Sequence, residues 1–162
     1  MDPVDFLIVI VEASVGLLGF TGVVVSFRRG SESLWSARER ARLVTLLGWG
    51  AIPLASALLS LALLSAELQP RMLWRISSLG WLVFFAPFTT WYMVWVLRTG
   101  RLKTFSWVYF LTNVLIVIVV VALQLVNVAH WNRFWPHFSA LAVTLALATS
   151  QFVRLIWFKL FG

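Results

Sequence analysis

The chain has 162 residues, of which 61% are hydrophobic and only 12% are charged. Soluble domains are about 45–50% apolar and about 25% charged, so a soluble fold of this size would lack the polar surface to cover its core, and the apolar content excludes a disordered chain. The sequence contains no cysteine, which excludes disulfides, thiol catalysis and cysteine-ligated metals. The composition predicts an integral membrane protein.

Five apolar segments are each long enough to cross a hydrocarbon core of about 30 Å at about 1.5 Å per residue. The connections between them are short, which predicts that consecutive helices are antiparallel neighbours. No shift in composition marks a domain boundary. The sequence therefore predicts an all-α bundle of five transmembrane helices in one domain over residues 1–162. The predicted spans are Phe6–Phe27, Leu43–Leu64, Met72–Leu97, Phe105–Val128 and Phe134–Phe158.

The basic residues predict an orientation, because cytoplasmic loops carry an excess of Lys and Arg. Ten basic residues fall at one side of the predicted bundle, and only Arg71, Arg75 and Arg133 fall at the other. This bias predicts that the N-terminus lies outside and the C-terminus inside, in a bacterial-type inner (plasma) membrane. It also accounts for the net charge of +7 without a nucleic-acid partner.

The connection between the first two spans contains a predicted capping box, from Ser36 to Glu39, which starts a helix one or two turns before the membrane. Arg38 and Arg42 share a face of this helix. Together with Trp35, these arginines are suited to hold anionic lipid headgroups or a partner protein. The alternative is that they anchor the helix without a specific ligand.

Glu12 lies inside the first span, at about 9–10 Å from its outer end at about 1.5 Å per residue. An ionisable residue at this depth is costly unless it is paired, hydrated or protonated. At the helical step of about 100° per residue, Glu12 shares a face with Gly16 and Gly19, and small residues let another helix approach closely. We therefore expect Glu12 to point into a tight helix seam or an adjoining cavity. It is either a proton-coupled or cation-binding carboxylate, or a structural ion pair.

Two residues at the same outer level are candidate partners of Glu12. Arg75 enters the third span about one turn below its start and is the natural counter-ion. His137 lies in the first turn of the fifth span, and histidine is the side chain whose unperturbed pKa lies near neutral pH. A pair of Glu12 with either residue is a candidate ion or proton site, and it is equally a candidate structural clamp.

The fourth span carries amides along one helical stripe. Asn113, Gln124 and Asn127 fall near one line, because eleven residues make almost three helical turns. An amide inside a membrane must find a hydrogen-bond partner, so this stripe is expected to face the bundle interior. The amides line a narrow polar path in one interpretation and join neighbouring helices in the other.

Missing motifs limit the function. The sequence has no Gly-rich phosphate loop, no Gly-x-Ser-x-Gly elbow and no His-Glu-x-x-His, and no second carboxylate inside the spans for acid–base work. We expect a non-enzymatic protein without cofactor or metal. One hypothesis is a small transporter or channel, in a homo-oligomer, that uses Glu12 for coupling or selectivity. The other is a membrane subunit or scaffold that holds a partner protein or anionic lipid through its basic loops and its glycine-lined first helix.

Overall fold

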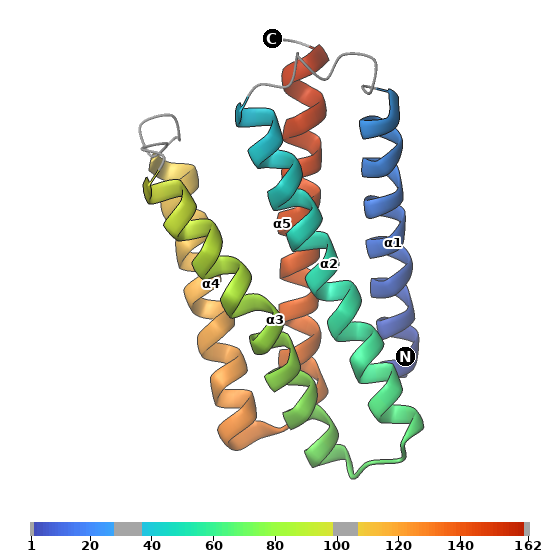
Figure 1. Cartoon of the computed structure of the whole chain (residues 1–162). Helices are drawn as coiled ribbons and strands as arrows, with labels where there is room; N and C mark the ends of the chain where they lie inside the picture. The colour runs from blue at the N-terminus through green and yellow to red at the C-terminus, as the bar shows by residue number, and fades with distance from the viewer. Residues whose placement is uncertain (1, 28–36, 99–106, 161–162) are drawn as a thin grey trace. The chain divides into compact units, whose positions relative to one another are not determined.

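The computed structural model describes residues 2–27, 37–98 and 107–160, and these residues are helical almost throughout (Figure 1). The prediction of an all-α fold is confirmed for them. Consecutive helices are joined, where the structure describes the connection, by turns of a few residues. The elements are α1 (Pro3–Phe27), α2 (Ala37–Ser65), α3 (Pro70–Arg98), α4 (Trp107–Val126), the π-helical turn η3 (Asn127–Trp131) and α5 (Phe134–Leu160).

Four stretches of these helices are long and apolar enough to cross a membrane, with mean hydropathy between 1.2 and 2.5. They coincide with the first four predicted spans to within a few residues, which supports a multi-pass membrane protein. The fifth predicted span stays a prediction, as does the orientation of the chain. The four stretches are Pro3–Ser26, Leu43–Ser65, Pro70–Trp95 and Leu111–Trp131.

The chain folds into two compact units. Unit 1 comprises Met1–Leu61 and Leu141–Gly162, and so contains α1, most of α2 and most of α5. Unit 2 comprises Ala62–Ala140, and so contains α3, α4 and η3 together with the last residues of α2 and the first turns of α5. The expectation of a single domain stays a prediction.

One face of α1 is buried in unit 1. Leu7, Ile10, Ser14 and Thr21 are buried, and their spacing of three, four and seven residues places them on one side of a helix. The hydroxyl of Thr21 donates to the carbonyl of Leu17 at 2.7 Å, so this polar group is satisfied inside its own helix. The hydroxyl of Ser14, on the same face, is buried without a hydrogen-bond partner.

Gly50 brings α1 close to α2. A Cβ atom built at Gly50 would lie 3.0 Å from Cδ2 and 3.4 Å from Cγ of Leu18. Any larger side chain at Gly50 must displace Leu18. A second contact joins α1 to α5, where the rings of Phe20 and Phe152 meet edge to face at 6.5 Å between centroids. The three helices of unit 1 are therefore held by apolar contacts.

Unit 2 is built around α3. The indole of Trp81 is fully buried and stacks on the ring of Phe85 at 4.2 Å between centroids. Nearer the start of α3, Trp74 is buried and packs against Phe134 at 4.9 Å. The turn from α2 to α3 contains Glu67 with a positive φ of 52°, and its N–H donates to the carbonyl of Leu64 at 3.1 Å.

Replacing Gly50 with valine should destabilise unit 1, because the added methyl groups overlap with Leu18. Overpacking of this kind costs about 1–3 kcal/mol. The measurement is the Tm of the purified protein in detergent, followed by circular dichroism. Gly22→Val is the matched control, since no atom lies within 4 Å of a Cβ at Gly22. Equal Tm values for the two variants would contradict the close contact at Gly50.

Candidate functional site

The polar residues predicted from the fourth and fifth spans meet in unit 2. Gln124, Asn127 and His137 are fully buried, as are Ser77 and Ser78 of α3. These side chains come from the end of α4, the start of η3, the first turn of α5 and α3. We call these five residues the amide cluster. The prediction that the amide stripe faces the interior is confirmed at Gln124 and Asn127.

Asn127 holds the amide cluster together through three hydrogen bonds. Its Nδ2 donates to Oγ of Ser78 at 2.8 Å and to the carbonyl of Arg133 at 3.1 Å. Its Oδ1 accepts the backbone N–H of Arg133 at 2.9 Å. Both donors and the acceptor of the amide are therefore used, and one side chain joins α3 to the segment that leads into α5.

The π-helical turn η3 places this amide. α4 ends at Val126, and the backbone N–H of Asn132 donates to the carbonyl of Asn127 at 2.9 Å, five residues back. Asn132 adopts the left-handed conformation, with φ 49° and ψ 48°, which asparagine tolerates better than most residues. The sequence pattern did not predict η3. The Asn at position 132 was the available signal for a sharp helix end.

Gln124 forms the second link of the amide cluster. Its Nε2 donates to the carbonyl of Pro136 at 2.6 Å, which lies in the first turn of α5, while its Oε1 is buried and accepts no hydrogen bond. His137 follows directly, and its ring lies 6.3 Å from the ring of Trp74 between centroids. These contacts join the end of α4 to the start of α5. We call this arrangement a helix clamp.

Two of the predicted path residues lie apart from the amide cluster. Asn113 is half-buried and lies eleven residues before Gln124 on α4, which is about 16 Å along the helix at about 1.5 Å per residue. Arg75 is exposed on α3. Gln124, Asn127 and His137 are buried in unit 2, whereas Asn113 lies nearer the start of α4, and the polar path that the sequence suggested stays a prediction.

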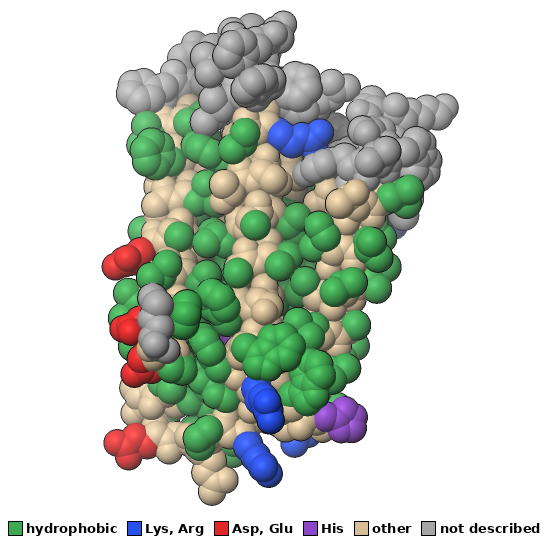
Figure 2. All heavy atoms as spheres, turned by 180° about the vertical axis from the view of Figure 1, so that it is seen from behind, with side chains coloured by type: hydrophobic (Ala, Val, Ile, Leu, Met, Phe, Trp, Pro, Cys, Tyr) green, Lys and Arg blue, Asp and Glu red, His purple; other side chains and the backbone are tan. Residues whose placement is uncertain are grey.

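Glu12 lies in unit 1, on the exposed side of α1. The core of unit 1 takes the opposite face of the helix, so Glu12 does not point into this core. The expectation of a tight helix seam or an adjoining cavity at Glu12 stays a prediction. Ser14 is on the buried face, and two residues at about 100° each turn Glu12 to the other side. Figure 2 shows acidic side chains next to hydrophobic ones along the edge that α1 forms.

Gly16 and Gly19 share the exposed side with Glu12. Both are exposed, and no atom lies within 4 Å of a Cβ built at either position. They therefore make no close helix contact with the described residues, and the helix-packing expectation for these glycines stays a prediction. Val23, one turn further along, is 50% exposed. We call Glu12, Gly16, Gly19 and Val23 the glycine face of α1.

The remaining predicted residues cannot be compared with the structure. Trp35 lies outside the described residues, and so do the side chains of Arg38 and Arg42. The start of α2 at Ala37 agrees with a helix that begins before the membrane. The pairing of Glu12 with Arg75 or His137 stays a prediction, because Glu12 belongs to unit 1 and the other two residues to unit 2.

Comparisons of the chain with protein-family models, with curated proteins and with solved structures found no match. Within the residues that the structure describes, no group of three or more His, Asp or Glu side chains is placed to hold a metal ion. The chemistry that the chain offers is therefore read from two features, the amide cluster and the glycine face.

Replacing Asn127 with alanine should destabilise the protein, because it removes all three hydrogen bonds and leaves the N–H of Arg133 without its acceptor. A buried donor left in this way costs about 1–3 kcal/mol, measured as a lower Tm in detergent. Ser139→Ala is the control, since the hydroxyl of Ser139 donates to the carbonyl of Trp135 in its own helix at 2.8 Å. A Tm of Asn127→Ala equal to that of the control would contradict the clamp.

Proposed function

We propose that this protein is a non-enzymatic membrane subunit that associates with a second copy through the glycine face of α1. One observation carries the proposal: Glu12 is exposed within Pro3–Ser26, a stretch apolar enough to span a membrane. A charged side chain that faces lipid costs up to about 2.5–3.5 kcal/mol on insertion scales, the value at the centre of a spanning helix. A neighbouring protein that covers Glu12 removes this cost.

The shape of the glycine face supports close packing. Helices associate in membranes through van der Waals contact and hydrogen bonds, and small residues allow their backbones to approach. The open space at Gly16 and Gly19 provides such an approach. Phe20, which is 66% exposed, borders the face and adds apolar area to the contact.

The position of Glu12 favours a second copy of the chain as the partner. Symmetric dimers are the commonest oligomers, and their two subunits use the same patch. Two copies in one membrane share one orientation, so their axis of symmetry is the membrane normal and both Glu12 side chains lie at the same depth. Two facing carboxyl groups at one depth are placed to form a hydrogen bond between the copies, and such bonds between helices stabilise association in membranes.

The proposal includes five membrane spans in a bacterial-type inner (plasma) membrane. The N-terminus lies outside and the C-terminus lies in the cytoplasm. α5 has 27 residues, and a helix of this length extends about 40 Å, more than the hydrocarbon core of about 30 Å. The ten-to-three distribution of basic residues supports the orientation.

A second function, transport of an ion or small solute, is favoured by the same exposed carboxylate. A dimer through the glycine face would enclose two Glu12 side chains at the contact, where a proton or cation can bind. This function makes Glu12 the coupling or selectivity residue, whereas the subunit function makes it a packing residue.

Gly19→Leu should weaken self-association at least about tenfold, because the larger side chain holds the two α1 helices apart. This factor corresponds to about 1.4 kcal/mol. The measurement is energy transfer between donor-labelled and acceptor-labelled protein in liposomes at increasing lipid-to-protein ratios. Ala122→Leu is the matched control, since Ala122 is exposed on α4, outside the glycine face. If Gly19→Leu and Ala122→Leu both self-associated as strongly as the unmodified protein does, the proposed dimer would be overturned.

Glu12→Gln separates the two functions. Glutamine keeps a hydrogen bond between the copies and cannot release a proton, so association should stay within about twofold of the original. Proton or cation flux into the same liposomes should disappear only if Glu12 carries transport. Asp5→Asn, a carboxylate change in the first turn of α1, controls for charge. Unmodified protein that passes no ion under any imposed gradient would exclude the transport function.

The five-span topology can be tested with single cysteines, because the chain contains none of its own. A membrane-impermeant maleimide should label Asp2→Cys and Ala66→Cys in intact cells. Arg98→Cys, and a cysteine appended after the last residue, should react only after permeabilisation. Labelling of the appended cysteine in intact cells would mean that α5 does not cross the membrane.

A further inference from the structure

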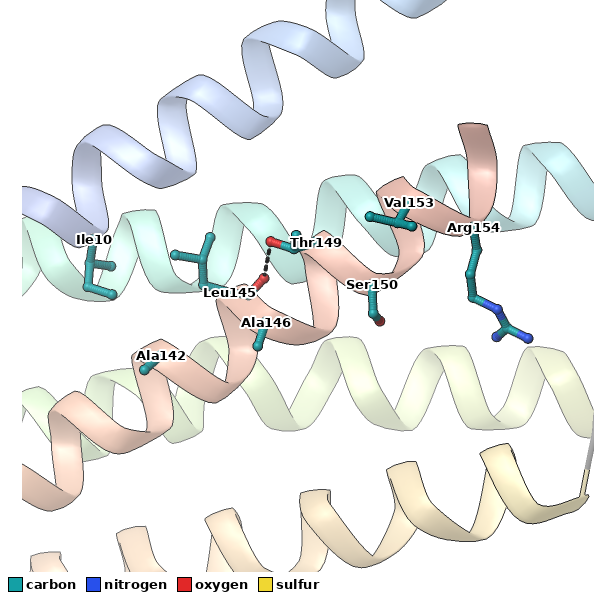
Figure 3. Close-up of a pocket in the computed structure, with 8 residues that line it drawn as sticks. All are labelled: Ile10, Ala142, Leu145, Ala146, Thr149, Ser150, Val153 and Arg154. Atoms are coloured by element: carbon teal, nitrogen blue, oxygen red, sulfur yellow. Dashed lines mark hydrogen bonds between the residues drawn. The ribbon is translucent and has the colours of Figure 1, made fainter. Parts of the chain in front are cut away.

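A groove of about 740 Å³ runs along α5 within unit 1. Its lining is apolar apart from two hydroxyls and one charge, and Ile10 of α1 closes one side. Ala142, Ala146 and Ser150 form its floor at intervals of four residues, and Arg154 follows after another four. Figure 3 shows Ala146, Ser150 and Arg154 projecting from the same side of the helix. A volume of this size lies within the range of about 300–1,000 Å³ that ligand sites occupy.

The two hydroxyls in the groove are committed to their own helix. Oγ1 of Thr149 donates to the carbonyl of Leu145 at 3.0 Å (Figure 3), and Oγ of Ser150 donates to the carbonyl of Leu147 at 2.8 Å. Their donors are therefore used, and both residues present mainly carbon to the groove. A flexible hydrocarbon chain fits such a surface better than a polar solute does.

Arg154 gives the groove a charged end. It is the charged residue among the described residues that line the groove. Ala142 and Arg154 are twelve residues apart, which is about 18 Å along the helix at about 1.5 Å per residue. One leaflet of a bilayer contributes about 15 Å, half of a hydrocarbon core of about 30 Å. The apolar part of the groove thus matches the depth of one leaflet. Arg154 lies about 6 Å before the predicted end of the span at Phe158, at about 1.5 Å per residue, and a long arginine side chain can extend from there to the headgroups.

We propose that this groove binds one anionic phospholipid, with an acyl chain along Ala142, Ala146 and Ser150 and the phosphate at Arg154. A guanidinium binds phosphate through paired N–H donors, so Arg154 supplies a charge-assisted contact of defined geometry. With α5 in the bilayer, lipid is already present around the groove. A lipid that enters the groove therefore loses less translational entropy than a ligand that binds from water.

The lipid site lies on residues different from those of the proposed dimer. It rests on one part of the proposed function, which is that α5 lies in the bilayer. The glycine face belongs to α1, and the lipid site is built on α5 with Ile10 from the opposite side of α1. A variant that loses lipid binding and keeps self-association would therefore be altered at the lipid site alone. A variant that keeps lipid binding and loses self-association would be altered at the glycine face alone.

The test counts bound lipid on the purified protein by native mass spectrometry, after exchange into detergent with either phosphatidylglycerol or phosphatidylcholine of identical acyl chains. Phosphatidylglycerol should be retained about fivefold more strongly than phosphatidylcholine. At about 1.4 kcal/mol per tenfold, this factor is ~1 kcal/mol, which is the contribution of one basic residue near an anionic membrane surface. Arg154→Gln should abolish this preference. Arg40→Gln, at an exposed arginine of α2, should keep it. Inorganic phosphate added to the same sample should not displace the lipid, because it lacks the acyl chain.

Ala146→Leu should fill the groove and lower the retention of both lipids at least about fivefold. Ala51→Leu, at an exposed alanine of α2 in the same unit, is the matched control. Ala142→Val serves as a second filling variant, and the Tm of each variant shows that it is folded. Retention unchanged in the folded filling variants would overturn the proposal. It would also be overturned if those variants lost self-association and kept their lipid, since a second helix would then occupy the groove.

Discussion

A polar side chain in apolar surroundings is costly unless it finds a hydrogen-bond partner within the protein. This constraint accounts for most of the side-chain hydrogen bonds of the described residues, although the buried hydroxyls of Ser14, Ser56 and Ser77 make none. Other hydroxyls meet the constraint most simply: those of Thr21, Ser60 and Thr89 donate to the carbonyl four residues earlier. Such bonds need no second helix. The amides of Gln124 and Asn127 instead bond to groups outside their own helical segment, so they determine which segments are joined. Asn127 is the clearest case, because a single amide contacts both α3 and the start of α5.

Helical periodicity was sufficient to predict the residues that share each face. Gln124 and Asn127 lie on one buried stripe of α4 and η3, as their spacing indicates, because amides are costly in lipid and helices bury them where they can. The same periodicity placed Glu12, Gly16 and Gly19 together on α1. It could not predict the direction in which that face points, because Leu7, Ile10 and Ser14 form an alternative face that is nearly as suitable for burial and is the one that unit 1 covers.

Contacts between distant residues were beyond the sequence. Nothing in the local pattern around Ser78 marks it as the acceptor of the Asn127 amide, since the two residues are 49 positions apart. The close approach of Leu18 to Gly50 likewise depends on how α1 and α2 pack. The π-helical turn η3 also depends on contacts between distant residues. One additional residue per turn at Asn127–Trp131 turns the amide toward its partners, and this adjustment has no signature in composition.

The arrangement of the two units has a consequence for biosynthesis. Unit 2 is one continuous piece of chain, Ala62–Ala140, whereas unit 1 combines Met1–Leu61 with Leu141–Gly162. Chains are made from the N-terminus at about 5–20 residues per second, so α1 and most of α2 leave the ribosome seconds before the segment of α5 that completes their unit. During that interval all the residues of unit 2 are synthesised. The hydrogen bonds of Asn127 and Gln124 can therefore close before unit 1 is complete, and until α5 emerges α1 has only α2 as a partner within its unit.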